Sequence, residues 1–146
     1  VIEKVDGPSH LKVVEEFGYE MYMHCGAIRK VLLAWQTPAF IDEYFKNIIL
    51  HDQAFPHVRP DDLREELKKI RQDGYAITHG EYVTDALGIG APVFNSDGEL
   101  AGSIGIIAPE IRVDTPELLD TQKDLVQFYA SSLSADLGYE KHDVFQ

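Results

Sequence analysis

The sequence predicts an α+β protein in which helices pack on an antiparallel sheet. Extended apolar runs occur near the start and in the second half of the chain, and hairpin-type turn signals join them. Three amphipathic helical segments lie between these regions, and a fourth follows the last strand. The predicted order is β-β-α-α-α-β-β-β-α. Strands joined by hairpins favour this class over a doubly wound sheet, whose strands alternate with helices.

The first predicted strands lie near the start of the chain. Residues 11–15 carry β-branched side chains and residues 20–23 alternate in polarity, and Gly18 between them suits the turn of a hairpin. Residues 1–5 have the pattern of a strand already under way and do not begin with methionine. We therefore expect the chain to be a fragment of a larger protein.

Three helices are predicted next, each from its boundary residues. Small residues from Cys25 lead into apolar positions at helical spacing, and Thr37-Pro38 supplies the hydroxyl cap and the first-turn proline of a second helix. Residues 51–60, with two prolines, are expected to form a loop. The capping-box pattern Asp62-x-x-Glu65 predicts the start of a third helix, and Gly74 its end.

From Tyr75 onward the period becomes that of strands. Residues 86–94 form an apolar run that ends at the turn signal Asn95-Ser96-Asp97-Gly98, and residues 100–107 return as the next strand. Thr115-Pro116 repeats the helix-start pattern. The helix that follows is expected to end at Gly138, ahead of a C-terminal tail at residues 139–146. Large side chains at helical spacing predict one buried stripe on it: Leu118, Leu125, Tyr129, Leu133 and Leu137.

Composition limits the class of protein. The chain has 146 residues, enough for one domain, and its net charge of −12 opposes binding of these residues to a phosphate backbone. A single cysteine excludes an internal disulfide and fits a reducing compartment. No apolar run approaches the roughly 18 residues of a membrane span, and the start lacks a signal-peptide pattern. These features predict a cytoplasmic protein that does not bind membranes.

Few residues suggest catalysis. Cys25 stands beside His24 at a helix start, where a thiol can be activated, but neighbouring residues of an extended segment point to opposite faces. His79-x-Glu81 would share one strand face, yet no typical zinc-ligand spacing accompanies it, so no metal and no cofactor is predicted. Glu81 could act as a general base or as a structural hydrogen-bond acceptor.

Several ordered motifs resemble the effector-binding domain of IclR-type bacterial transcriptional regulators. They are Arg71-x-x-Gly74-Tyr75-Ala76 followed by Glu81, then Ile89-Gly90-Ala91-Pro92-Val93-Phe94-Asn95 and Gly98, with Lys30-Val31-Leu32-Leu33-Ala34 before them. The likeness covers residues 1–138. It implies a GAF-like antiparallel sheet that holds a small effector, assembly into homodimers or homotetramers, and DNA binding only through an N-terminal winged helix-turn-helix domain that is absent from this chain.

The resemblance also assigns a ligand-binding pocket, usually for a carboxylate or an aromatic acid. Carried onto this chain, it would be lined by Met21, Ala27, Ile28, Thr78, Ala86, Gly88, Gly105 and Ile107. The start of a helix near Ala27 offers free backbone N–H groups and a positive dipole that suit a carboxylate.

The chain departs from the family pattern at several of these positions. Thr78 stands where Asp or Ser is usual, Gly88 where Cys, Ser or Ala is usual, and Gly105 and Ile107 where hydroxyls are common in relatives that bind small oxoacids. Losing polar groups and volume predicts a larger pocket for a larger or more apolar effector, such as an aromatic acid. Arg29, which replaces the usual glycine, could supply a counter-charge or belong to a solvated helix face.

Two other functions remain open from the sequence. The pocket could be filled by its own side chains, with Ile28 and Ile107 pointing inward, which would leave a ligand-free dimerisation domain. The chain could also be a small thiol-dependent enzyme that uses Cys25. The family resemblance favours a non-enzymatic sensor.

Overall fold

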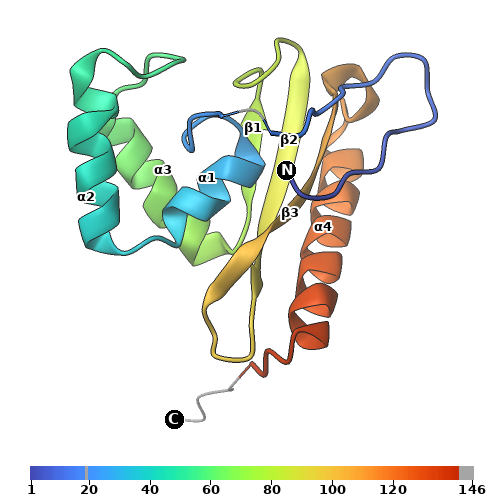
Figure 1. The fold of residues 1–146 in the computed structure, drawn as a ribbon. Coiled ribbons are helices and arrows are strands. Elements are labelled where there is room, and N and C mark those ends of the chain that lie inside the picture. Colours follow the sequence, from blue (N-terminus) through green and yellow to red (C-terminus); the bar gives the residue numbers. More distant parts are fainter. Residues whose placement is uncertain (19, 142–146) are drawn as a thin grey trace.

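The computed structural model describes residues 1–18 and 20–141 and confirms the α+β class. Its elements follow in the order α1 (Ala27–Ala34), α2 (Pro38–Asn47), η1 (Ile49–His51), α3 (Pro60–Asp73), β1 (Ala76–His79), β2 (Ala86–Phe94), β3 (Leu100–Pro109), η2 (Glu110–Arg112) and α4 (Pro116–Asp136). The sheet lies in the middle of the molecule, with α1 to α3 on one side and α4 on the other (Figure 1).

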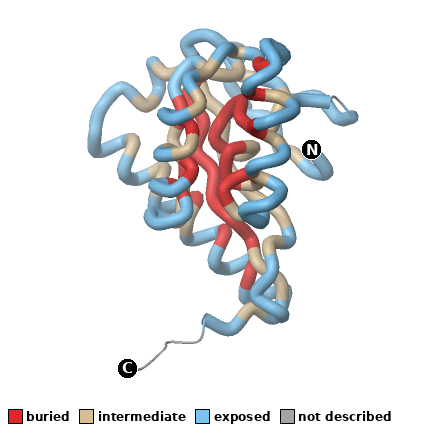
Figure 2. Tube along the Cα trace, turned by 90° about the vertical axis from the view of Figure 1, so that its left-hand side faces the viewer, coloured by how far each residue is buried: buried red, intermediate tan, exposed pale blue. Residues whose placement is uncertain are grey.

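The sheet is antiparallel throughout, in the order β1-β2-β3. Thr78 pairs with Gly88 and Gly90 pairs with Gly105. The predicted turn after β2 is confirmed, because the Asn95 side chain accepts hydrogen bonds from the backbone N–H groups of Asp97 and Glu99. The central strand β2 is buried along almost its whole length, and it forms the red middle of the fold in Figure 2.

The two faces of β2 carry different residues, which sets the distance to each helix layer. The larger side chains pack against α4, where Ile89 meets Val126 and Ala130 in one buried cluster. Two of the alternate positions, Gly88 and Gly90, face the start of α1: a Cβ added at Gly90 would lie 2.9 Å from the backbone N and Cα of Ile28. Because no side chain intervenes, α1 rests directly on the sheet.

The predicted helix boundaries hold except at α3. Thr37 and Thr115 cap α2 and α4 through their side-chain oxygens, each ahead of a first-turn proline, and Gly74 ends α3 with a left-handed φ of 81°. The predicted capping box at Asp62 is wrong, because α3 begins two residues earlier, at Pro60. The fixed φ of a first-turn proline is sufficient to start the helix there.

The predicted N-terminal strands are not present. Residues 1–5, 11–15 and 20–23 contain no strand, and residue 19 lies outside the described part of the chain. Ile2 and Val5 are almost fully exposed. An isolated hairpin is marginal in water unless one face packs on a core, and these segments expose most of their side chains, although Met23 packs against the core. The confirmed order is α-α-α-β-β-β-α.

The predicted buried stripe of α4 is also wrong. The side chains that the helix buries are Val126, Ala130 and Ser134, because the face with small residues fits closely on the sheet. The face predicted to be buried is 40–57% exposed: Leu118, Leu125, Tyr129, Leu133 and Leu137.

No helix of the described residues is long and apolar enough to cross a membrane.

The C-terminus follows the expectation in part. The helix ends before Gly138, whose φ is 85°. Tyr139 is not loose, because its N–H donates to the Ser134 carbonyl and its ring lies 5.2 Å from that of Phe94. The rest of the predicted tail beyond residue 141 lies outside the described residues.

Candidate functional site

A small cavity lies where the N-terminus of α1 meets the sheet. Strands β1, β2 and β3, the start of α1 and the β1–β2 loop (residues 80–85) all contribute to its walls. The lining residues are Gly26, Ala27, Ile28, Arg29, Thr78, Glu81, Tyr82, Val83, Ala86, Leu87, Gly88 and Ile107.

Two backbone N–H groups at the start of α1 donate to side chains of the cavity wall. The N–H of Ala27 donates to Oγ1 of the buried Thr78 at 3.0 Å, and the N–H of Gly26 donates to a carboxylate oxygen of Glu81 at 3.2 Å. The first N–H groups of a helix have no partner within the helix and carry the positive end of its dipole. Both N–H groups are therefore paired with oxygen atoms of side chains from the same protein, and one of these side chains is a carboxylate.

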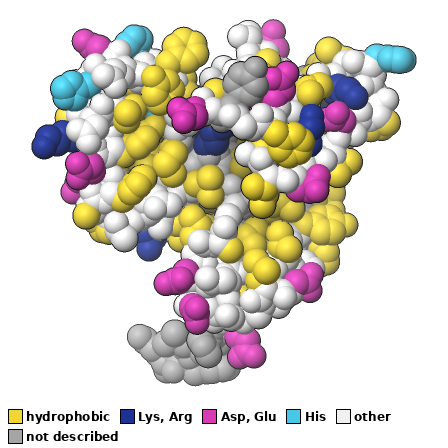
Figure 3. Space-filling model, viewed as in Figure 1, with side chains coloured by type: hydrophobic (Ala, Val, Ile, Leu, Met, Phe, Trp, Pro, Cys, Tyr) yellow, Lys and Arg dark blue, Asp and Glu magenta, His cyan; other side chains and the backbone are white. Residues whose placement is uncertain are grey.

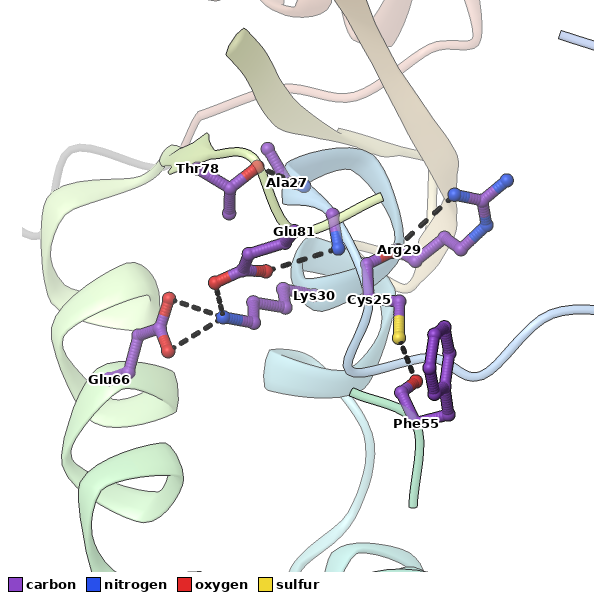
Figure 4. A network of polar contacts seen from close by, with 9 residues as sticks. Cys25, Ala27, Arg29, Lys30, Phe55, Glu66, Thr78 and Glu81 are labelled. Atoms are coloured by element: carbon purple, nitrogen blue, oxygen red, sulfur yellow. Dashed lines mark hydrogen bonds and ion pairs between the residues drawn. The ribbon is translucent and has the colours of Figure 1, made fainter. Parts of the chain in front are cut away.

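A buried lysine stands beside this carboxylate. The side chain of Lys30 is only 2% exposed, and its Nζ donates to Glu81 at 2.6 Å and to both carboxylate oxygens of Glu66 at 2.7 and 2.8 Å. Figure 4 shows the ammonium group between the two carboxylates, one from α3 and one from the β1–β2 loop. One cation thus holds two anions, and the cluster carries a formal surplus of negative charge.

Arg29 is part of the wall and does not lie on a solvated helix face. Its side chain is 17% exposed, it pairs with Glu15 at 3.1 Å, and its guanidinium lies 4.4 Å from the centre of the Tyr82 ring. The charge of Arg29 is therefore already matched by a carboxylate of the same chain.

The cavity has a volume of about 20 Å³. A single water needs roughly 10–15 Å³, so a ligand of several atoms requires the walls to move apart. The enlarged pocket predicted at Gly88 is not seen in this structure. A Cβ at Gly88 would lie 2.9 Å from the Thr78 hydroxyl and 3.4 Å from the Ala27 side chain, which occupy the space that the missing side chain leaves.

Most residues assigned to the pocket by resemblance meet here. Six of the eight line the cavity: Ala27, Ile28, Thr78, Ala86, Gly88 and Ile107. Met21 and Gly105 are outside this lining, Met21 being 38% exposed and Gly105 packed beneath the Ile28 side chain. The sequence reasoning missed the contributions of Gly26, Tyr82, Val83 and Leu87, and it gave no sign that Lys30 and Glu66 meet Glu81.

Cys25 lacks the properties of a nucleophile. Burial raises the pKa of its thiol to about 11, and the negative charge of Glu81 adds to this effect, so the thiol is protonated at neutral pH. The sulfur donates to the carbonyl of Phe55. His24 is fully buried with Nδ1 2.8 Å from the Tyr44 hydroxyl, and burial lowers the pKa of its imidazole. The thiol and the imidazole therefore bond to different partners and do not form a catalytic pair.

His79 lies apart from the cavity. Its imidazole is exposed and pairs with Glu110 at 3.1 Å, beside an open groove of about 460 Å³ between η2 and the start of α4. Within residues 1–18 and 20–141, no group of three His, Cys, Asp or Glu side chains is arranged to hold a metal ion. His79 and Glu81 therefore belong to different parts of the surface.

The fold is that of a small α+β domain with a cavity at the start of one helix, and comparison with known proteins gives its family. The sequence model described as "Bacterial transcriptional regulator IclR C-terminal" matches residues 1–135. This chain belongs to that family of transcriptional regulators, which are not enzymes.

Individual relatives agree with this result. The chain is 31% identical over 115 residues to the uncharacterized HTH-type transcriptional regulator RhmR of Escherichia coli K12, covering 77% of this chain and 44% of that protein. It is 26% identical over 139 residues to the HTH-type transcriptional regulator KipR of Bacillus subtilis, covering 94% and 55%. The chain thus spans about half the length of these relatives.

A solved structure shows the same fold. The crystal structure of Thermotoga maritima IclR superposes with a TM-score of 0.80 at 28% identity, covering 94% of this chain and 56% of that one.

Proposed function

We propose that this chain is the effector-sensing domain of a transcriptional regulator, and that a small acid binds at the N-terminus of α1. The observation that carries the proposal is the pair of N–H donors of Gly26 and Ala27, which already hold oxygen acceptors at the cavity wall. The wall is otherwise largely apolar, which favours a carboxylate on an aromatic or other apolar body. Residues 1–138 form the sensing domain in this proposal.

The proposed output is a change in DNA binding by a domain outside this chain. With a net charge of −12, these residues are poorly suited to contact DNA themselves. An effector can act only if it binds one arrangement of two or four such domains more tightly than another. We place this regulation in the cytoplasm.

The exposed apolar face of α4 supports self-association. Hydrophobic side chains gather on the side of the molecule where α4 lies (Figure 3). Phe128 is 65% exposed and Tyr129 57% exposed on this helix, and apolar patches of this kind commonly mark interfaces. The proposed homodimer or homotetramer would cover them.

Replacing Phe128 by glutamate should therefore dissociate the oligomer. We expect light scattering at micromolar concentration to give the mass of two or four chains for the wild type and of fewer chains for F128E. Gln72→Glu adds the same charge on an exposed position of α3 and should leave the mass unchanged. A monomeric wild type, or equal masses for all three proteins, would contradict the role of α4.

The second candidate function is a ligand-free dimerisation domain. The cavity volume of about 20 Å³ favours it, because the structure as it stands has no room for an effector. The two candidates differ in whether any small acid stabilises the folded chain.

A thermal-shift panel of small carboxylates, aromatic acids and sugar acids separates them. A ligand at 100 times its dissociation constant adds about 2.7 kcal/mol to the free energy of unfolding, which raises the melting temperature by several degrees. We expect one class of acid to do so in a dose-dependent manner.

The cavity can be tested with a pair of glycine variants. Gly88→Ala puts a methyl group into the cavity wall, whereas a Cβ at Gly102 meets no atom within 4 Å. The shift should shrink in G88A and persist in G102A. No shift with any acid would favour the ligand-free domain, and an equal shift in both variants would place the ligand elsewhere.

A further inference from the structure

The carboxylate of Glu81 occupies the position that an acidic ligand would need. It accepts from the Gly26 N–H at the helix start and from the ammonium group of Lys30, at 3.2 and 2.6 Å. These are a backbone donor at a positive helix terminus and a cation, the two kinds of group that bind a carboxylate most strongly. Figure 4 shows both contacts.

We propose that Glu81 is a built-in carboxylate that keeps the site closed, and that an acidic effector displaces it. The inference rests on the proposed function, and it adds the manner in which the site opens. Glu81 lies in the β1–β2 loop together with Tyr82 and Val83, which also line the cavity. When Glu81 leaves, these residues move with it and the space for the ligand grows.

The base of the loop and the Val83 carbonyl are held by backbone hydrogen bonds, whereas Glu81 and Tyr82 are held by side-chain contacts at the cavity. At the base, the N–H of Gly80 donates to the carbonyl of Ala86 at 2.8 Å, and the carbonyl of Asp85 accepts from the N–H of Glu110 at 2.9 Å. The middle of the loop is attached to α1 through the Glu81 carboxylate and through the stacking of Tyr82 on Arg29. Both attachments are at the cavity.

The exchange conserves the charge around Lys30. A buried ammonium group is costly without anionic partners. When a ligand carboxylate replaces the carboxylate of Glu81, Lys30 still has two anionic partners, the ligand and Glu66. Glu81 is already 27% exposed, so its carboxylate needs only a short path to water. A neutral ligand of the same shape offers no anion to Lys30 and cannot make this exchange.

The first test is competition with benzoate. The Glu81 carboxylate is part of the same chain and therefore competes with a ligand at a high effective concentration. Removing its charge should free the site for a ligand carboxylate. We expect Glu81→Gln to bind benzoate at least about tenfold more tightly than the wild type, with no gain for benzamide.

The control is Glu66→Gln, which removes the other carboxylate from Lys30 and leaves Glu81 in place. Its affinity for benzoate should rise less than that of E81Q, because Glu81 still occupies the Gly26 N–H and the ammonium group of Lys30. An equal gain in E66Q and E81Q would show a general charge effect, and equal binding by E81Q and the wild type would show that Glu81 does not compete. Either result overturns the displacement and leaves the proposed acid sensor standing.

A second test does not depend on the effector. Glu81→Ala leaves the Gly26 N–H and Lys30 facing a carboxylate-sized space, which acetate can fill. Against the same concentration of chloride, 0.1 M acetate should raise the melting temperature of E81A by roughly 2 °C or more. It should not do so for the wild type, in which Glu81 fills this space. No difference between acetate and chloride would overturn the inference, whereas acetate rescue without any benzoate binding would support the carboxylate site and count against an aromatic acid as effector.

Discussion

Replacing Lys30 by methionine is expected to lower the free energy of unfolding by about 2–4 kcal/mol. Methionine keeps the buried apolar stem but leaves Glu66 and Glu81 facing each other without a cation. Removing one partner of a buried ion pair commonly costs about 3–5 kcal/mol. The two carboxylates retain 36% and 27% exposure and can turn to water, which lowers the expected loss to about 2–4 kcal/mol.

Urea denaturation of K30M and of a matched surface variant measures this effect. Lys68 is 73% exposed and pairs with Glu65 one turn away on α3, so Lys68→Met should leave the midpoint almost unchanged. A similar midpoint for K30M and K68M would mean that the cluster does not join α1 to α3 and the β1–β2 loop.

Replacing Gly105 by alanine should destabilise the chain by a similar amount, about 2–4 kcal/mol. A Cβ at this position would overlap the Ile89 carbonyl oxygen and lie 2.7 Å from Cγ1 of Ile28. The carbonyl is backbone within the sheet, so the strain cannot be relieved by a side-chain rotation alone. Either β3 must separate from β2 or α1 must rise from the sheet.

Gly102→Ala is the matched control on the same strand, because its Cβ would meet no atom within 4 Å. We expect its denaturation midpoint to stay within experimental error of the wild type. If G105A and G102A unfold at the same urea concentration, the close approach of α1 to the sheet is not as the structure describes it.

The parts of the fold that were predicted correctly depend on local signals. Thr37 and Thr115 cap their helices, and Asn95 organises the β2–β3 turn, through hydrogen bonds to residues two to four positions away. The sequence also located the helix start at Ala27 that forms one wall of the cavity. Such contacts can be inferred from neighbouring residues alone.

Apart from the start of α3, which is a local error, the main errors concern contacts between distant segments. Helical spacing identified an apolar face on α4, but it could not show that small residues such as Ala130 would pack on the sheet and leave Leu133 exposed. Lys30 is separated from Glu66 and Glu81 by 36 and 51 residues, and a lone lysine in a helix ordinarily indicates a solvated face. The polar cluster at the site was therefore not visible in the sequence.

The most direct test of the effector site is an amide nuclear magnetic resonance titration of this chain with the acid that gives the largest thermal shift. Binding at the proposed site predicts the largest changes at the amides of Gly26, Ala27 and Thr78, together with Glu81 as its carboxylate leaves. Changes centred on His79 and Ile111, which line the separate groove beside α4, would contradict the assignment of the site.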